Sequence, residues 1–492
     1  MRLRYVGCAV VLLAFLEIPC AGANIKASGQ KITSNQFPVT TSSTVARNRF
    51  EKSMQALEYL RRAEAVDDLR SALKADPNFA QAYILISDLS HDPAEKQEDL
   101  TRAKTLAPHV SSSERLLIQC LAGVQEDDYV PAIAAMNDLL ARYPQDKRLL
   151  FLAGRWLIHQ ERYPQGIVIL ERAVTLDPNY PAALNELGYA YAYSGDFEKG
   201  SAAMERYVAL EPDQPNPHDS YGEILRLAGK FDAALKQYQM SIRVDPSFGS
   251  ELGVADTYAV MGREQDAREE YDRAIVFTSS ESDRVEYELQ AATTWIRENN
   301  RKQAEKALKD VSHHAHVTGL AVLEAESHRF LAMYEPDYKA AMKQLQTAQS
   351  ALDDGKDVSK GASGDEQARI LSARAERAAE AADMETATSA LQQLESMAQS
   401  SRSQVVQLCY HDAAGATLLA QGKASDAIAH LEEDNANPVA MHLLWKAYTR
   451  TGAAAQAGAL ASRLAGWNEP TLEQALVVPQ FRSGLVSQAG QP

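Results

Sequence analysis

A proline recurs at intervals close to 34 residues through the first half of the chain, and this period constrains the fold more than any other feature. The prolines that follow it are Pro77, Pro108, Pro144, Pro178, Pro212 and Pro246, separated by 31, 36, 34, 34 and 34 residues. Four of them directly follow an apolar segment that ends in Asp or Glu. A proline disfavours helical backbone in the residue before it. Each copy is therefore expected to end a helix, and the spacing predicts a repeated helix hairpin.

The repeats at 147–180, 181–214 and 215–248 share one arrangement of small and large residues. Each has a glycine in its predicted first helix, at Gly154, Gly188 and Gly222, about one turn from large apolar residues. A small residue lets the two helices of a hairpin approach closely, and the large residues fill spaces in the next hairpin. A further copy follows at 249–277, an earlier one covers 46–79, and looser copies span 80–144.

This 34-residue pattern resembles the tetratricopeptide repeat family. The resemblance implies an all-α fold, an α-solenoid of stacked antiparallel helix hairpins in a right-handed superhelix, with the repeats clearest at 147–277. Beyond about residue 284 the period decays, although helix-turn-helix punctuation persists. The expected organisation is a signal peptide at 1–23, a flexible linker at 24–45, the tetratricopeptide repeat array at 46–277, degenerate helical-hairpin repeats at 284–465, and a C-terminal cap and tail at 466–492.

The first 23 residues have the order of a secretory signal peptide. Arg2 and Arg4 precede an apolar run at 6–16, and the small residues 21–23 provide a cleavage site after Ala23. The apolar run is shorter than the roughly 18–20 residues that cross a bilayer. Lipidation at Cys20 fits less well, because the residues before it are not small, and an uncleaved anchor is the other alternative. The protein is therefore expected to be exported, either periplasmic or secreted.

The charge balance excludes some partners. The chain has 66 acidic and 50 basic residues and a formal net charge of −16. A duplex nucleic acid or an anionic lipid surface is disfavoured, because phosphate recognition requires a basic surface. A protein or an extended peptide with basic or polar character is the expected partner. Export would leave Cys120 and Cys409, both in apolar, helical contexts where buried free thiols are expected.

The resemblance also implies a concave groove lined by the first helix of each hairpin. Positions opposite the packing residues on three consecutive first helices are candidates for this groove. They are Phe151, Arg155, His159, Asn185, Tyr189, Tyr193, Asp219, Glu223 and Arg226. Asn185 suits the bridging of backbone amides, the tyrosines offer rigid contact area, and the charges would select a peptide sequence. The alternative is a solvated concave surface, with the partner bound on another face.

Signatures of catalysis are absent from the sequence. It contains no Gly-rich phosphate loop, dinucleotide fingerprint, Gly-x-Ser-x-Gly elbow or His-Glu-x-x-His motif. His313, His314 and His316 form the one cluster that suggests a metal, but they fall at a predicted helix end, where histidines also interact with the helix dipole. We therefore expect a scaffold with no catalytic activity, metal or cofactor. The alternatives are a structural subunit of a cell-envelope assembly and a metal-dependent enzyme with a site in the C-terminal half, and the oligomeric state is open.

Overall fold

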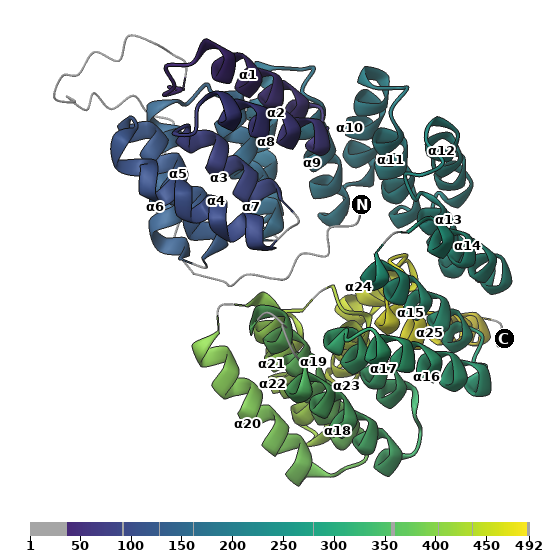
Figure 1. The fold of residues 1–492 in the computed structure, drawn as a ribbon. Coiled ribbons are helices and arrows are strands. Elements are labelled where there is room, and N and C mark those ends of the chain that lie inside the picture. Colours follow the sequence, from purple (N-terminus) through teal and green to yellow (C-terminus); the bar gives the residue numbers. More distant parts are fainter. Residues whose placement is uncertain are drawn as a thin grey trace. The chain divides into compact units, whose positions relative to one another are not determined.

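The computed structural model describes residues 37–489 apart from 91–92, 127, 161, 279, 356–359, 402 and 435. The expected signal peptide and residues 24–36 of the expected linker lie outside the described residues. Within the described part the chain has 25 α-helices, one short 3-10 helix and no strand (Figure 1). The all-α fold of stacked helix hairpins is thus confirmed. No helix of this part combines the length and the apolar character that a membrane span requires.

The chain divides into two compact units at residues 211 and 212, which we call the N-terminal and C-terminal units. The described part of the N-terminal unit consists of five hairpins. They are α1 (Thr44–Glu58) with α2 (Arg62–Ala75), α3 (Ala80–Leu89) with α4 (Pro93–Leu106), α5 (Ser112–Gln125) with α6 (Tyr129–Arg142), α7 (Lys147–His159) with α8 (Tyr163–Leu176), and α9 (Pro181–Tyr193) with α10 (Phe197–Leu210).

The described part of the C-terminal unit has seven hairpins and a final helix. The hairpins are α11 (Pro215–Leu227) with α12 (Phe231–Val244), α13 (Glu251–Met261) with α14 (Glu264–Phe277), α15 (Glu281–Arg297) with α16 (Arg301–Val317), α17 (Ala321–Tyr334) with α18 (Tyr338–Asp354), α19 (Lys360–Glu380) with α20 (Met384–Ser400), α21 (Gln404–Ala420) with α22 (Ala424–Leu431), and α23 (Pro438–Thr451) with α24 (Ala454–Ala465). The last helix is α25 (Leu472–Ala489).

The helices end where the prolines predict. Asp76, Asp177 and Asp245 each follow a second helix and precede a periodic proline, and their φ angles are −148°, −137° and −147°. This extended backbone is what a following proline favours, so each helix stops one residue before the aspartate. The helices of the C-terminal unit include five of 17 residues, at α15, α16, α18, α20 and α21. These longer helices explain why the 34-residue period decays there.

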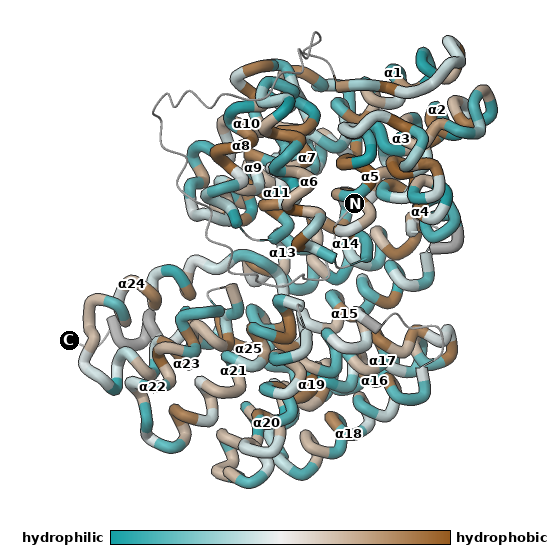
Figure 2. Tube along the Cα trace, turned by 90° about the vertical axis from the view of Figure 1, so that its left-hand side faces the viewer, coloured by the Kyte–Doolittle hydropathy of each residue, from teal (hydrophilic) through white to brown (hydrophobic). Residues whose placement is uncertain are grey.

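The glycines of the first helices have the predicted packing purpose. A Cβ at Gly154 would lie 2.5 Å from Cγ of Leu170, and a Cβ at Gly188 would lie 2.5 Å from Cε of Met204. Leu170 and Met204 are fully buried on the second helices of the same hairpins. The close approach of each helix pair therefore depends on the missing side chain. Figure 2 shows that the helices carry both hydrophobic and hydrophilic residues, as expected where one side of a helix packs and another meets solvent.

The expected linker is corrected at its C-terminal end, because residues 37–43 pack on the N-terminal unit. The Thr40 amide donates to Glu114 Oε1 at 2.6 Å, and the Thr40 hydroxyl donates to Glu114 Oε2 at 2.5 Å. The Gln81 amide donates to the carbonyl of Pro38 at 2.7 Å. These bonds join the segment to α3 and α5, so this stretch is part of the folded unit.

Candidate functional site

The first helices of neighbouring hairpins contact one another in the N-terminal unit. α3 contacts α5, α7 contacts α9, and α1 also contacts α9. We call the surface formed by α3, α7 and α9 the inner face. Six of the nine predicted groove residues belong to this unit, on α7 and α9.

A cluster of charged and polar side chains occupies part of the inner face. Arg155 on α7 forms an ion pair with Asp88 on α3, with 3.1 Å between Nη2 and Oδ2. Burial, followed by the positive charge of Arg155, lowers the pKa of His159 to about 3, so its imidazole is neutral at physiological pH. Burial raises the pKa of Glu186 to about 7, which the nearby Arg155 opposes. Asp88 and Glu186 were not predicted as groove residues, because nothing in their sequence context distinguishes them from surface carboxylates.

Three tyrosine rings stack beside this cluster. The rings of Tyr189 and Tyr193 on α9 are 6.3 Å apart with an interplanar angle of 20°, and the ring of Tyr163 on α8 lies 5.7 Å from that of Tyr193 at 24°. Tyr193 is 43% exposed. Tyr163 comes from a second helix, so the prediction from first helices alone missed it. The stack is a rigid aromatic surface that a partner side chain or backbone can cover.

Asn185 lies one turn before Tyr189 on the same helix. Its Oδ1 atom is buried and has no hydrogen-bond partner among the described residues. A buried acceptor without a partner costs about 1–3 kcal/mol. An N–H donor from a bound segment would remove this cost, so Asn185 is suited to bind a ligand backbone.

Two predicted groove residues are buried instead of presented to a partner. Phe151 is buried, with its ring 5.4 Å from that of Tyr180 and covered by the guanidinium of Arg155. Arg226 is 1% exposed, and its Nη1 donates to the carbonyl of Asn468 at 3.0 Å. The assignment of these two residues to an open binding surface is corrected, because aromatic packing covers one and the C-terminal segment of the chain covers the other.

The three predicted residues from the third repeat lie in the C-terminal unit. Asp219 accepts a hydrogen bond from the Ser250 hydroxyl at 2.6 Å, and Glu223 pairs with Arg226 at 3.2 Å. Both carboxylates therefore have partners within their own unit. The structure does not gather all nine predicted residues within one unit.

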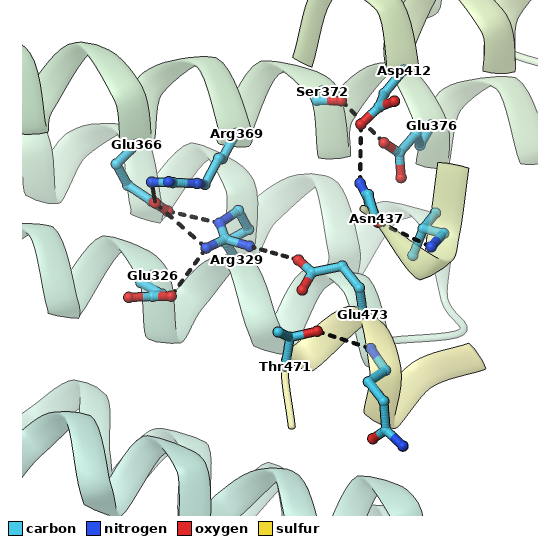
Figure 3. A network of polar contacts seen from close by, with 12 residues as sticks. Glu326, Arg329, Glu366, Arg369, Ser372, Glu376, Asp412, Asn437, Thr471 and Glu473 are labelled. Carbon is cyan, nitrogen blue, oxygen red and sulfur yellow. Dashed lines mark hydrogen bonds and ion pairs between the residues drawn. The ribbon is translucent and has the colours of Figure 1, made fainter. Parts of the chain in front are cut away.

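A second polar site, centred on Arg329 of α17, lies inside the C-terminal unit (Figure 3). Arg329 donates from Nε to Glu366 Oε1 on α19 at 2.7 Å and from Nη2 to Glu326 at 3.3 Å, and its Nη1 lies 3.9 Å from Glu473 of α25. Arg329 and Glu366 are almost fully buried. Burial raises the pKa of the Glu366 carboxyl, which Arg329 opposes. This ion pair joins two helices of the array through the interior.

A group of buried carboxyls lies beside this ion pair. Asn437 donates to Asp412 Oδ2 at 3.0 Å, and the Ser372 hydroxyl donates to Glu376 Oε1 at 3.0 Å (Figure 3). Burial raises the pKa of Glu376 to about 8. Burial and the neighbouring charge of Asp434 also raise the pKa of Asp412. Glu376 is therefore largely protonated near neutral pH. The group comes from several helices whose residues are far apart in the sequence, so it could not be predicted from local patterns.

The histidine cluster does not converge on one point. His314 Nδ1 lies 2.8 Å from Glu288 on α15, whereas His316 Nδ1 lies 3.1 Å from Glu324 on α17. In the part of the chain that the structure describes, no group of three or more His, Cys, Asp or Glu side chains is arranged to hold a metal ion. Cys120 and Cys409 are free and buried, as expected. Burial raises the pKa of both thiols, that of Cys120 to about 12.

Comparison with known proteins identifies the repeats. Two family models, both described as tetratricopeptide repeat, match residues 127–181 and 157–224. The chain thus contains tetratricopeptide repeats. No curated protein matches the chain.

Several solved structures are similar to the chain. The APC/C hetero-tetramer Cut9–Hcn1 has 16% identity and a TM-score of 0.41, with 84% of this chain and 78% of its own covered. MamA has 20% identity and a TM-score of 0.30, with 34% and 91% covered. TTC0263, a thermophilic TPR protein of Thermus thermophilus, has 20% identity and a TM-score of 0.26, with 41% and 92% covered.

Tetratricopeptide repeats mediate binding between proteins, and proteins built from them are typically scaffolds without catalytic activity. The family matches and the all-helical hairpins together indicate that this chain is a scaffold for protein interaction.

Proposed function

We propose that the chain is an exported scaffold that binds an extended segment of a partner protein on the inner face of its N-terminal unit, without catalysing a reaction. The observation that carries the proposal is the buried Oδ1 atom of Asn185, which has no partner among the described residues and lies on the helix that bears Tyr189 and Tyr193. An extended backbone supplies N–H donors that no side chain of the described unit supplies to this atom. The tyrosine stack then provides area for the adjacent ligand side chains.

The charges of the inner face would select the ligand sequence. Arg155 is already paired with Asp88, and His159 is neutral, so the face has no large excess of positive charge. Glu186, with its pKa raised to about 7, would lose its proton readily beside a lysine or arginine of the ligand. A segment with a basic residue near its contact with α9 therefore fits best, which agrees with the acidic net charge of −16.

Binding can be tested with peptides selected from a random display library on the chain that begins at residue 24. We expect Asn185→Ala and Tyr193→Ala each to weaken the selected peptide at least tenfold in fluorescence anisotropy. Tyr193 is 43% exposed, so its variant should keep the thermal midpoint of the wild type. Phe277→Ala on α14 is the matched control, because it also removes an exposed aromatic ring and should leave the affinity unchanged. Equal affinities for all four proteins would remove the inner face as the binding site.

Export is supported by the basic, apolar and small-residue order of the first 23 residues. Expression with a C-terminal tag, followed by cell fractionation and N-terminal sequencing, tests it. We expect the mature chain to begin at Asn24 and to leave the cytoplasm. A chain that retains Met1 and stays in the cytoplasm would contradict export and leave the binding proposal intact.

A further inference from the structure

Residues 467–483, which include most of α25, lie against first helices of the C-terminal unit. Its helix α25 contacts α15, α23 and α24 (Figures 1 and 2). Leu472 and Ala475 join the apolar cluster formed by α15–α17, and Val478 packs with Met441 of α23 and Leu464 of α24. The three side chains are spaced by three residues, so they form one stripe along α25. The segment packs on this surface through these side chains, as a docked helix would.

Three arginines from first helices hold the segment. Arg226 of α11 donates to the Asn468 carbonyl at 3.0 Å. Arg297 of α15 donates from Nε to Gln474 Oε1 at 2.9 Å and from Nη2 to the Thr471 carbonyl at 3.3 Å. Arg329 of α17 lies 3.9 Å from Glu473 (Figure 3). All three guanidinium groups are almost fully buried, so their donors bond within the protein rather than to solvent. Some reach the segment, and the others bond to neighbouring helices or to the arginine's own helix.

The segment does not supply a partner for every buried donor of these arginines. Arg297 forms no ion pair with a carboxylate among the described residues: it donates to the Thr293 hydroxyl of its own helix at 2.6 Å and to the neutral amide of Gln474 at 2.9 Å. The Nε atom of Arg226 and the Nε1 atom of Trp467 are buried without partners in the same part of the chain. Burial lowers the pKa of the Arg297 guanidinium, although Tyr271 and Glu264 nearby oppose this, because no carboxylate pairs directly with the buried cation. A ligand with a glutamate in place of Gln474 would therefore suit Arg297 better than the present occupant does.

The apolar contact is incomplete as well. A pocket of about 240 Å³ lies between α23 and α25, lined by His442, Trp445, Leu476, Val477, Gln480, Phe481 and Gly484. The pocket is open to solvent, so α23 and α25 do not cover each other completely at this junction. Pro479 lies inside α25 and cannot donate the backbone hydrogen bond that a helix expects at this position. Both features favour release of the segment over release of the other helices.

We propose that α11, α15, α17 and α23 form a binding surface for an acidic amphipathic helix of a partner protein, and that residues 467–483 occupy this surface as an intramolecular ligand. Arg297 selects the partner through a carboxylate at the position of Gln474. The partner displaces α25 and fills the pocket beside His442 and Trp445. This surface belongs to the C-terminal unit, and its use does not depend on the inner face of the N-terminal unit.

Peptides that compete with the segment provide the test. Two labelled peptides span residues 466–484, one with the native sequence and one with Gln474→Glu. The receptor is the chain from residue 24 carrying Leu472→Ala and Val478→Ala, which weaken the intramolecular ligand and leave the surface intact. We expect this receptor to bind the native peptide at least tenfold more tightly than the wild-type chain does. The Gln474→Glu peptide should bind it a further tenfold more tightly.

Two receptor variants identify the anchor. Arg297→Gln added to the weakened receptor should abolish the advantage of the Gln474→Glu peptide. Arg273→Gln on α14 is the matched control, since this arginine is exposed and forms its ion pair with the neighbouring Glu270, and it should change neither affinity. A weakened receptor that keeps its helical circular dichroism and binds neither peptide would overturn the proposal. A dimer that exchanges C-terminal segments, detected by light scattering, would overturn it in favour of a second copy as the occupant.

Hydrogen exchange on the wild-type chain tests the same idea without a substitution. We expect the amides of α25 to exchange through an opening that leaves α15 and α17 protected. Exchange of α25 together with α15 and α17, at one common rate of opening, would show that the segment is an inseparable part of the core and would overturn the proposal.

Discussion

Tyr238 is held between two glycines, and this arrangement makes a sharp prediction about stability. Its ring is 1% exposed. A Cβ at Gly222 of α11 would lie 2.9–3.0 Å from the ring, and a Cβ at Gly253 of α13 would lie 2.6 Å from Cδ1 and closer still to Cε1 and Cζ. The ring cannot retreat from one helix without approaching the other. Gly253→Ala should therefore destabilise the C-terminal unit.

Two effects of opposite sign decide the magnitude. Inserting a methyl group into a packed core costs about 1–3 kcal/mol. Alanine is favoured over glycine in a helix interior by about 1 kcal/mol, which opposes that cost. Because the clash is severe, we place the overpacking cost at the upper end of its range. The expected net loss is about 1–2 kcal/mol, which lowers the thermal midpoint by about 2–4 °C per kcal/mol.

Gly458→Ala is the matched control for this substitution. Gly458 also lies inside a helix, α24, and a Cβ there would meet no atom within 4 Å. We expect this variant to be more stable than the wild type by up to about 1 kcal/mol, because only helix propensity acts. Thermal unfolding followed by circular dichroism at 222 nm compares both variants in the same transition of the C-terminal unit. A Gly253→Ala variant as stable as Gly458→Ala would refute the close approach of α11 and α13 to the ring.

Three further predictions concern buried ionisable groups. Arg329→Met should destabilise the C-terminal unit by about 3–5 kcal/mol in urea unfolding, because it leaves Glu366 buried without its cation, and the added substitution Glu366→Leu should restore most of the loss. The free energy of unfolding of this unit should fall as pH rises from 6.5 to 9, because the carboxyl of Glu376, with a folded pKa of about 8, binds a proton that the unfolded chain has already lost. In the Glu376→Gln variant the thermal midpoint should depend less on pH over this range. Cys120 and Cys409 should resist a thiol reagent in the native chain that begins at residue 24 and react with two equivalents in denaturant, since burial raises the pKa of both thiols; fast labelling of the native chain would contradict their burial.

The periodic features of the sequence predicted the hairpins well. Each Asp-Pro pair at 76–77, 177–178 and 245–246 marks a helix end in the structure. The glycines at 154 and 188 meet Leu170 and Met204 at the expected close approach. These features could be predicted because they act within one hairpin, where a residue type and its spacing determine the local packing.

The long-range contacts that bury side chains such as Arg226 could not be predicted in the same way. Arg226 was placed correctly on its helix, but its partner Asn468 is 242 residues further along the chain. Such a contact leaves no trace in a 34-residue period. The pairing of Arg329 with Glu366 and the burial of Glu376 depend on the same long-range packing. The periodicity thus predicts on which face of its helix a side chain lies, whereas the tertiary structure determines which residue it contacts.

This difference bears on how the two proposed surfaces would bind. Asn185 Oδ1 in the N-terminal unit has no partner to lose, so a ligand N–H gains the full benefit of pairing it, about 1–3 kcal/mol. Arg226 and Arg297 in the C-terminal unit already donate to the chain's own segment, so an incoming helix exchanges one set of bonds for another. Its net gain comes only from what the segment leaves incomplete, namely a carboxylate for Arg297, an acceptor for Arg226 Nε and the unfilled pocket at Trp445. Both surfaces therefore select a ligand by charge, but with opposite sign. Glu186 on the first surface favours a basic ligand residue, whereas Arg297 on the second favours a carboxylate, which a neutral competitor does not supply.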